Sequence, residues 1–215
     1  MNTKESLDYL VESLIDFNLE QKNFVNIILS AQMIQTSLSP FIWHQIIQTI
    51  AWPEIANGLK KHQHHANDLT QYLKKNHHIQ ATLFFKEKLN FNFVVSDINK
   101  MVQHHIKSGD EDAAEEILAA FLHYRENYPD LTSPWLNACK MIAVENGQVD
   151  IFLQLTPYLK QIENKDLYQL LARQINRLLE KKQETKTEIK ECRLCAQLLE
   201  LLSPDEKDFY QKLIF

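Results

Sequence analysis

Turn-forming residues are scarce in this chain. Only three glycines and six prolines occur among its 215 residues. A sheet-rich fold needs many tight turns, and tight turns rely on Gly, Pro and Asn-Gly pairs. Leu, Gln, Lys and Glu, which favour helices, are abundant instead. The sequence therefore predicts an all-α protein with long helices and few sharp reversals.

Apolar residues recur at helical spacing along most of the chain. Stripes at i, i+3, i+4 and i+7 predict helices near residues 4–17, 24–38 and 40–50, for example. The run Ser203-Pro204-Asp205-Glu206 is a capping box that opens a short terminal helix. Residues 91–95 have strand-like composition but no partner strand, so they are predicted as an extended connection into the next helix. In total we expect about twelve helices and no strand.

Two helical hairpins follow one another between Val94 and Ile162. Gly109 turns the first hairpin and Gly147 turns the second, 38 residues later. This spacing is typical of stacked helix-turn-helix repeats. It predicts that equivalent positions of the two hairpins lie 38 residues apart.

Prolines are expected to delimit these hairpins. Pro129 is predicted to end the first hairpin, and Ser133-Pro134 to cap the helix that follows. Thr156-Pro157 is predicted to kink or split the last helix of the second hairpin, because proline lacks a backbone N–H and clashes with the preceding turn.

The two hairpins resemble tetratricopeptide (TPR) repeats over about residues 94–163. The first hairpin matches the turn of that family in Ser108-Gly109-Asp110 and its small residue on the second helix in Ala114. Val102 and Lys140 stand where the family has a small residue on the first helix, so the repeats are divergent. The resemblance implies a concave groove that takes a peptide or helix of another protein.

The expected architecture is a right-handed α-solenoid, a helical-repeat stack of about twelve helices that is TPR-like in the middle. An N-terminal helical region would cover residues 1–92, and the TPR-like hairpins with the C-terminal helices would cover residues 93–215. Both regions are expected to form one continuous body.

Polar residues on the first helix of each hairpin are the predicted contacts of the groove. None of them is needed for the apolar stripes, and amide side chains there could read a peptide backbone. A methionine could adapt to an apolar anchor. The predicted groove residues are Asn99, Gln103, Lys107, Asn137 and Met141.

The formal charge of −5 disfavours chain-wide attraction to nucleic acid. The charge is uneven, however, because residues 59–90 carry six lysines against two acids. Within this Lys/His-rich segment, a secondary charged patch is predicted at Lys60, Lys61, Lys74 and Lys75. Such a patch could contact nucleic acid or an acidic partner, although a solvated helix face is the simpler interpretation.

Nine histidines and three cysteines are the remaining candidates for chemistry. His62 and His65 have the i, i+3 spacing of metal ligands on one helix face, but the sequence contains no HExxH pattern. Cys192 and Cys195 form one CxxC pair, and a zinc site would need a second pair. The two cysteines lie on an apolar helical stripe, where they are expected to pack as small hydrophobic residues. We therefore expect no metal, no cofactor and no catalytic residue.

These patterns favour a non-enzymatic protein–protein interaction module, such as an adaptor, chaperone or scaffold. Such a module could act within a larger bacterial-type assembly or secretion system. A helical effector or enzyme with a histidine-containing site is one alternative, and nucleic-acid or acidic-partner binding through residues 59–90 is another. The N-terminus carries acids and no apolar signal segment, and the three cysteines suit a reducing compartment, so a soluble cytoplasmic protein is expected.

Overall fold

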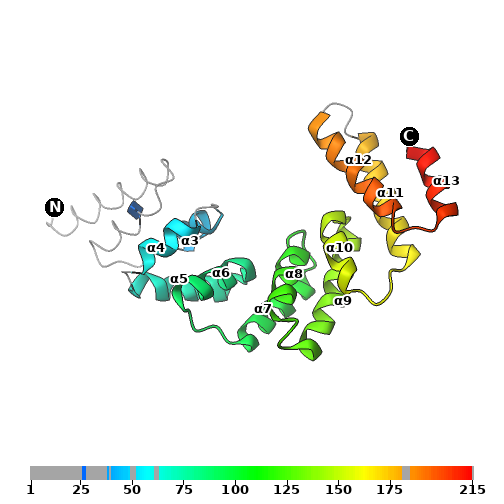
Figure 1. Ribbon diagram of the computed structural model, residues 1–215. Coiled ribbons are helices and arrows are strands. Elements are labelled where there is room, and N and C mark those ends of the chain that lie inside the picture. Colours follow the sequence, from blue (N-terminus) through cyan, green and yellow to red (C-terminus); the bar gives the residue numbers. More distant parts are fainter. Residues whose placement is uncertain are drawn as a thin grey trace, which may run out of the picture. The chain divides into compact units, whose positions relative to one another are not determined.

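A computed structural model describes residues 26–27, 38, 40–48, 52–60, 63–180 and 185–214. These residues form eleven α-helices, labelled α3 to α13, and one short 3-10 helix, η1, with no strand among them (Figure 1). The all-α prediction is confirmed, and the number of helices differs slightly from the twelve expected. The helices predicted near residues 4–17 and 24–38 lie almost wholly outside the described residues.

The helix bounds follow the chain in order. They are α3 Pro40–Ile47, α4 Trp52–Leu59, α5 Gln63–Asn76, α6 Ile79–Leu89, α7 Val95–Ser108, α8 Ala113–Tyr124, α9 Pro129–Asn146, α10 Val149–Leu155, η1 Thr156–Tyr158, α11 Asn164–Glu180, α12 Thr185–Leu199 and α13 Pro204–Ile214. Within the described ranges, no helix is long and apolar enough to cross a membrane.

The chain divides into two compact units between Val102 and Gln103, inside α7. In the first unit, α3 to α6 pack around buried apolar side chains, among them Trp43 and Phe85. Residues 90–94 then run as a non-helical connection into α7, as predicted. Lys74 of α5 holds this connection, because its ammonium lies 5.2 Å from the ring centroid of Phe93 and 3.2 Å from the carboxylate of Asp97.

In the second unit, α8 and α9 form the most extensive helix pair. Alanines on α8, including the fully buried Ala113, Ala114 and Ala120, allow the two backbones to approach closely. Cys139 of α9 fills the interface and donates its thiol to the carbonyl oxygen of Ala114 at 3.1 Å. Burial raises the pKa of the Cys139 thiol to about 12, so this cysteine is a neutral packing residue.

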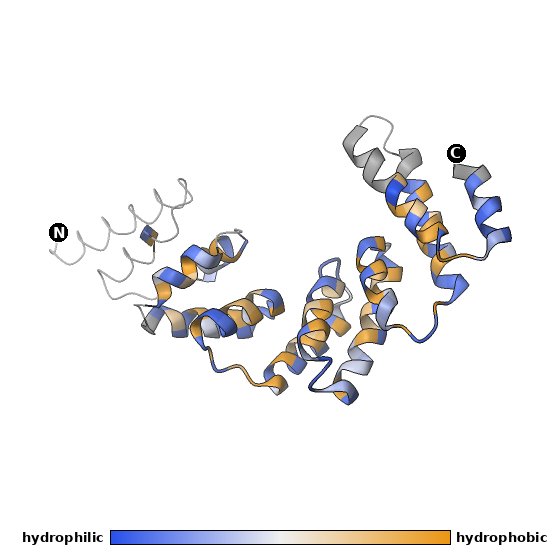
Figure 2. Cartoon of the chain, viewed as in Figure 1, coloured by the Kyte–Doolittle hydropathy of each residue, from blue (hydrophilic) through white to orange (hydrophobic). Residues whose placement is uncertain are grey.

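A second apolar cluster joins α10 to α11 and α12. Phe152 of α10 is fully buried there, surrounded by leucines of α11 and α12. Figure 2 shows hydrophobic and hydrophilic residues alternating around the helices, as expected for amphipathic elements. The cluster residues are Val144, Val149, Phe152, Leu167, Leu170, Leu171, Leu198, Leu199 and Leu202.

The start of α9 differs from the prediction. Pro129 does not end a hairpin but is the first residue of α9, where its missing N–H costs nothing, and Pro134 lies inside the helix. Pro134 removes one backbone hydrogen bond near the helix start. The helix nevertheless continues through it to Trp135, which is 1% exposed and whose ring contacts Tyr124 of α8. Burial of this tryptophan decides the local conformation.

Thr156-Pro157 splits the last helix of the second hairpin, as predicted. After α10, the chain makes the single turn η1 and then becomes extended at Leu159. The second helical hairpin was expected to extend to Ile162, but residues 159–163 are non-helical and connect to α11. We call residues 156–163 the connecting segment.

Both predicted glycine turns are present, with left-handed φ angles of +58° at Gly109 and +68° at Gly147. They are linked by side chains. The Asn146 amide donates to the carbonyl oxygens of Gly109 and Asp110 at 3.3 and 3.2 Å. Arg177 of α11 in turn donates to the carbonyl oxygens of Gly147 and Asn146 at 3.1 and 3.2 Å. Three successive layers of the second unit, namely the turn before α8, the turn between α9 and α10, and α11, are thus linked by hydrogen bonds.

The glutamate half of the predicted capping box is present at the start of α13. Glu206 accepts a hydrogen bond from the Ser203 backbone N–H at 3.2 Å, and also from the Ser203 hydroxyl. The same carboxylate accepts hydrogen bonds from the Tyr168 hydroxyl and, at 3.1 Å, from the Asn164 amide. Glu206 therefore both caps α13 and ties it to α11.

This arrangement predicts a pH-dependent attachment of α13. Hydrogen bonds from Ser203 and then Tyr168 lower the pKa of Glu206, so the folded state favours the charged carboxylate. Its stabilising effect should be complete above the ordinary carboxyl pKa and should disappear as the pH falls through the lowered value. The difference in melting temperature between wild type and Glu206→Gln should therefore be largest near neutral pH and vanish in acid. A difference that is independent of pH would contradict this role of the carboxylate.

Candidate functional site

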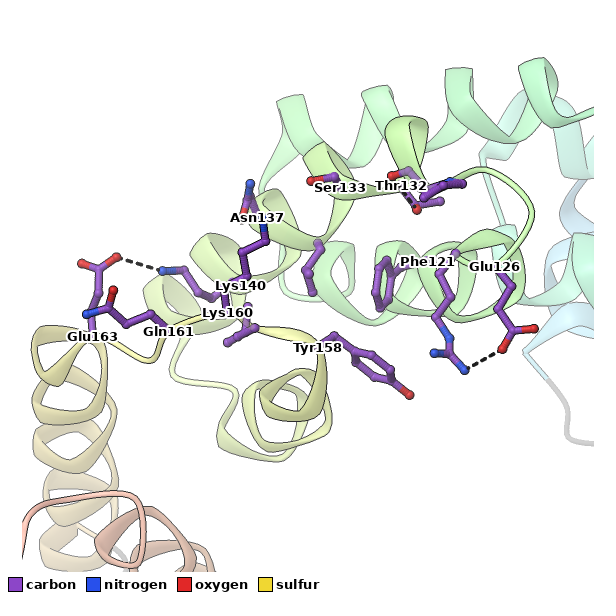
Figure 3. A pocket seen from close by; sticks show the side chains of 14 residues that line it. Phe121, Glu126, Thr132, Ser133, Asn137, Lys140, Tyr158, Lys160, Gln161 and Glu163 are labelled. Carbon is purple, nitrogen blue, oxygen red and sulfur yellow. Dashed lines mark hydrogen bonds and ion pairs between the residues drawn. The ribbon is translucent and has the colours of Figure 1, made fainter.

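A cleft of about 580 Å³ opens on the surface of the second unit (Figure 3). It lies between the C-terminal end of α8, the outer face of α9 and the connecting segment. We call it the α8–α9 cleft. Its lining residues are Phe121, Arg125, Glu126, Pro129, Thr132, Ser133, Leu136, Asn137, Lys140, Tyr158, Leu159, Lys160, Gln161 and Glu163.

One end of the cleft is aromatic. Phe121 of α8 and Tyr158 of η1 meet edge to face, with ring centroids 5.3 Å apart. Arg125, the C-cap residue of α8, follows Phe121 by four residues in a helical conformation and therefore emerges on the same side of the helix. Its guanidinium carbon lies 4.7 Å from the centroid of the Tyr158 ring, which places a cation over an aromatic face. The split of the helix at Thr156-Pro157 is what brings Tyr158 to this place.

The outer face of α9 supplies a row of polar side chains. Ser133, Asn137 and Lys140 recur at i, i+4 and i+7, so they share one face of the helix. Asn137 is exposed, and Figure 3 shows Ser133, Asn137 and Lys140 along the same rim. Hydroxyl and amide groups of this kind can both donate and accept hydrogen bonds.

Lys140 anchors the far end of the cleft. Its ammonium lies 2.9 Å from a carboxylate oxygen of Asp166 and 3.4 Å from one of Glu163, and its side chain is only 17% exposed. The hydrogen bond to Asp166 is the main reason that the pKa of Lys140 is raised. Lys140 thus fixes the end of the connecting segment and the start of α11 against α9. This explains why a long cation, and not a small residue, stands at this position.

The sequence prediction and the cleft coincide at one residue of the predicted groove. Asn137 lines the cleft, and Met141, one turn later on α9, is 57% exposed beyond its rim. Gln103 and Lys107 are exposed on α7, and Asn99 is half-buried in the first unit. The proposed equivalence of Asn99 with Asn137 stays a prediction.

The lysines of the predicted charged patch have separate environments. Lys74 is engaged by Asp97 and Phe93, as described above. Lys60 lines a cavity of about 300 Å³ beside Phe91, and Lys75 lines another of about 250 Å³ beside Trp43. Lys61 lies outside the described residues. Part of the positive charge expected from the sequence is therefore already compensated within the fold.

Histidines and cysteines provide no second candidate site among the residues that the structure describes, where no group of three His, Cys, Asp or Glu side chains could hold a metal ion. His65 is buried and its Nδ1 lies 3.7 Å from the Asp68 carboxylate, while His62 falls outside the described residues. Cys195 is buried on α12, as expected for a packing residue, and Cys192 is half-buried.

Arg125 and Tyr158 were missed as site residues by sequence reasoning. Arg125 follows an apolar stripe and Tyr158 follows a proline, and neither pattern indicates a binding role on its own. Their stacking joins the C-cap of α8 to η1, although the two residues are more than thirty positions apart. The one available signal was Thr156-Pro157, which predicted the break in the helix but not the contact between Tyr158 and Arg125.

Comparison with known proteins finds no family model, no curated protein and no solved structure that matches this chain. The TPR-like resemblance of residues 94–163 therefore stays a prediction from the sequence. Function has to be argued from the chemistry of the α8–α9 cleft.

Proposed function

We propose that this chain is a non-enzymatic protein-binding module that holds an extended peptide segment of another protein in the α8–α9 cleft. One observation carries the proposal: an aromatic end and a row of backbone-reading polar side chains line the same cleft. Asn137, predicted from the sequence to contact a partner, belongs to that row. An adaptor, chaperone or scaffold role, within a larger assembly or outside one, would use such a site.

The dimensions suit a short extended segment. The α9 lining runs from Pro129 to Lys140, which is about 16 Å at the rise of an α-helix. An extended chain advances roughly 3.3 Å per residue, so about five residues would span this length. Phe121, Tyr158 and Leu159 would take apolar side chains, and Ser133 and Asn137 would meet backbone N–H and C=O groups.

The cleft favours binding over catalysis. Lys140 is its most buried cation, and its raised pKa together with two carboxylate partners keeps it protonated, which does not suit a general base. The alternative of nucleic-acid binding through residues 59–90 is weakened by the engagement of Lys74 with Asp97. Protein binding is therefore the function we infer.

Asn137→Ala should weaken binding of a cleft peptide by about 1–3 kcal/mol, or roughly 5- to 150-fold, because the peptide loses buried hydrogen bonds. The unfolding temperature should stay nearly unchanged, since Asn137 is exposed. Peptides would be selected from a random twelve-residue display library on the full-length chain, and their dissociation constants measured by fluorescence polarisation.

The matched control is Asn92→Ala, which removes an exposed asparagine of the first unit. It should leave the dissociation constants unchanged. If every selected peptide binds Asn137→Ala as tightly as wild type, the α8–α9 cleft is not the peptide site and the proposed function loses its support.

A further inference from the structure

Arg125 is the most unusual side chain of the α8–α9 cleft. Its guanidinium is held over the Tyr158 ring, and its Nη2 donates to Oε1 of Glu126 at 3.3 Å. Its Nε is shielded from solvent, and within the described part of the chain no acceptor forms a hydrogen bond with it. A shielded N–H without an acceptor lowers the stability of the folded state, because it has lost its hydrogen bond to water. An arginine side chain that is already oriented loses little further conformational entropy when it binds an acceptor.

The guanidinium edge determines which chemistry fits. Nε–H and one N–H of Nη2 point in the same direction and form a fork that matches the two oxygens of a carboxylate. Glu126 occupies only one prong of this fork, at a long distance. Its side chain is 79% exposed, so it can rotate into water at little cost. Glu126 therefore binds the guanidinium edge of Arg125 only weakly, and a better-positioned carboxylate could replace it.

We propose that the peptide segment bound in the cleft carries an Asp or Glu side chain, which displaces Glu126 and binds the Nε–Nη2 edge of Arg125 with both oxygens. This inference rests on the proposed function and names the partner's chemistry: an extended segment with an internal acid beside apolar residues. Phe121 and Tyr158 form the apolar surroundings of this contact.

The charges around the contact support an acidic occupant. Lys160, exposed on the connecting segment, lines the same cleft, whereas Lys140 is neutralised by Asp166 and Glu163. Once Glu126 has moved away, Arg125 is a cation without its carboxylate partner. A neutral segment would leave that charge and the Nε–H unsatisfied, while an internal acid satisfies both.

The experiment uses the peptides selected on the full-length chain, all with acetylated and amidated ends so that no terminal carboxylate is present. Each acidic peptide is compared with its Asp→Asn or Glu→Gln analogue on wild type, Arg125→Gln and Arg125→Lys. We expect the acid-to-amide change to weaken binding to wild type about 10- to 100-fold, as for loss of a charge-assisted fork. The same change should have little effect on Arg125→Gln, and the full wild-type effect should not return in Arg125→Lys.

Glu126→Gln distinguishes recognition from a structural role of Arg125. Removal of the internal competitor should tighten binding of acidic peptides by roughly 2- to 5-fold, which damage to the fold would not do. The amide analogues should bind Glu126→Gln and wild type alike.

Two failures can be told apart. If the selected peptides require Asn137 but tolerate both the acid-to-amide change and Arg125→Gln, the peptide site exists and the carboxylate inference is wrong. If no selected peptide responds to Asn137→Ala, the proposed function fails, and the carboxylate inference, which rests on it, fails as well.

Discussion

Phe152→Ala should lower the free energy of unfolding of the second unit by about 3–5 kcal/mol, the usual cost of truncating a fully buried aromatic side chain. Phe152 is completely buried between α10 and the leucines of α11 and α12. Those helices cannot collapse freely onto the space left behind, because Arg177 fixes α11 to the Gly147 turn. A cavity would remain, and its lining would lose packing contacts.

Native-state hydrogen exchange in increasing urea measures this effect, because amides of α10 to α12 report the opening of the second unit separately from the first. The control is Leu122→Ala on α8, where the side chain is 39% exposed and the expected loss is below about 1 kcal/mol. A loss for Phe152→Ala no larger than for Leu122→Ala would contradict the packing of α10 against α11 and α12.

Gly147→Ala should cost about 2–3 kcal/mol, more than the same change at Gly109. Both glycines adopt left-handed φ angles, which add roughly 1–2 kcal/mol for a residue with a Cβ. Only at Gly147 would the new Cβ meet neighbours: it would lie 2.9 Å from Cδ of Arg173 and 3.4 Å from Nη2 of Arg177. Because 2.9 Å is shorter than any normal contact, the Arg173 side chain of α11 would have to shift away from the turn, whereas 3.4 Å from Arg177 is an ordinary contact.

Gly109→Ala is the matched control, because a Cβ there would have no heavy atom within 4 Å apart from those of its two chain neighbours. Its cost should therefore reflect backbone strain alone. Urea denaturation of the two variants, followed by far-UV circular dichroism, compares their midpoints. Equal losses at the two sites would contradict the close approach of Arg173 to the Gly147 turn.

The helical class of the fold could be predicted because the necessary information is local. Scarce glycines and apolar stripes predicted helices throughout, and the two turn glycines were identified from the sequence. The start of α9 could not be predicted in this way. Pro134 disfavours a helix locally, and the burial of Trp135 against α8, a tertiary effect, overrides that preference.

The candidate site was predictable only in part, for the same reason. Asn137 could be chosen because it is a polar residue that the apolar stripe of α9 does not need. Arg125 could not, because its role depends on Tyr158, which reaches it only after the helix breaks at Thr156-Pro157. A contact between two segments far apart in sequence leaves no periodic trace in either of them.

The hydrogen bonds between the turns of the second unit have a direction along the chain. Asn146 donates to the turn at Gly109, and Arg177 donates to the turn at Gly147, so in both cases the acceptor is synthesised before its donor. During translation, water can satisfy the carbonyl oxygens of each finished turn until the next layer emerges and replaces it. Each layer thus supplies hydrogen-bond acceptors for the layer that is synthesised after it. The second unit can therefore assemble in the order of its synthesis.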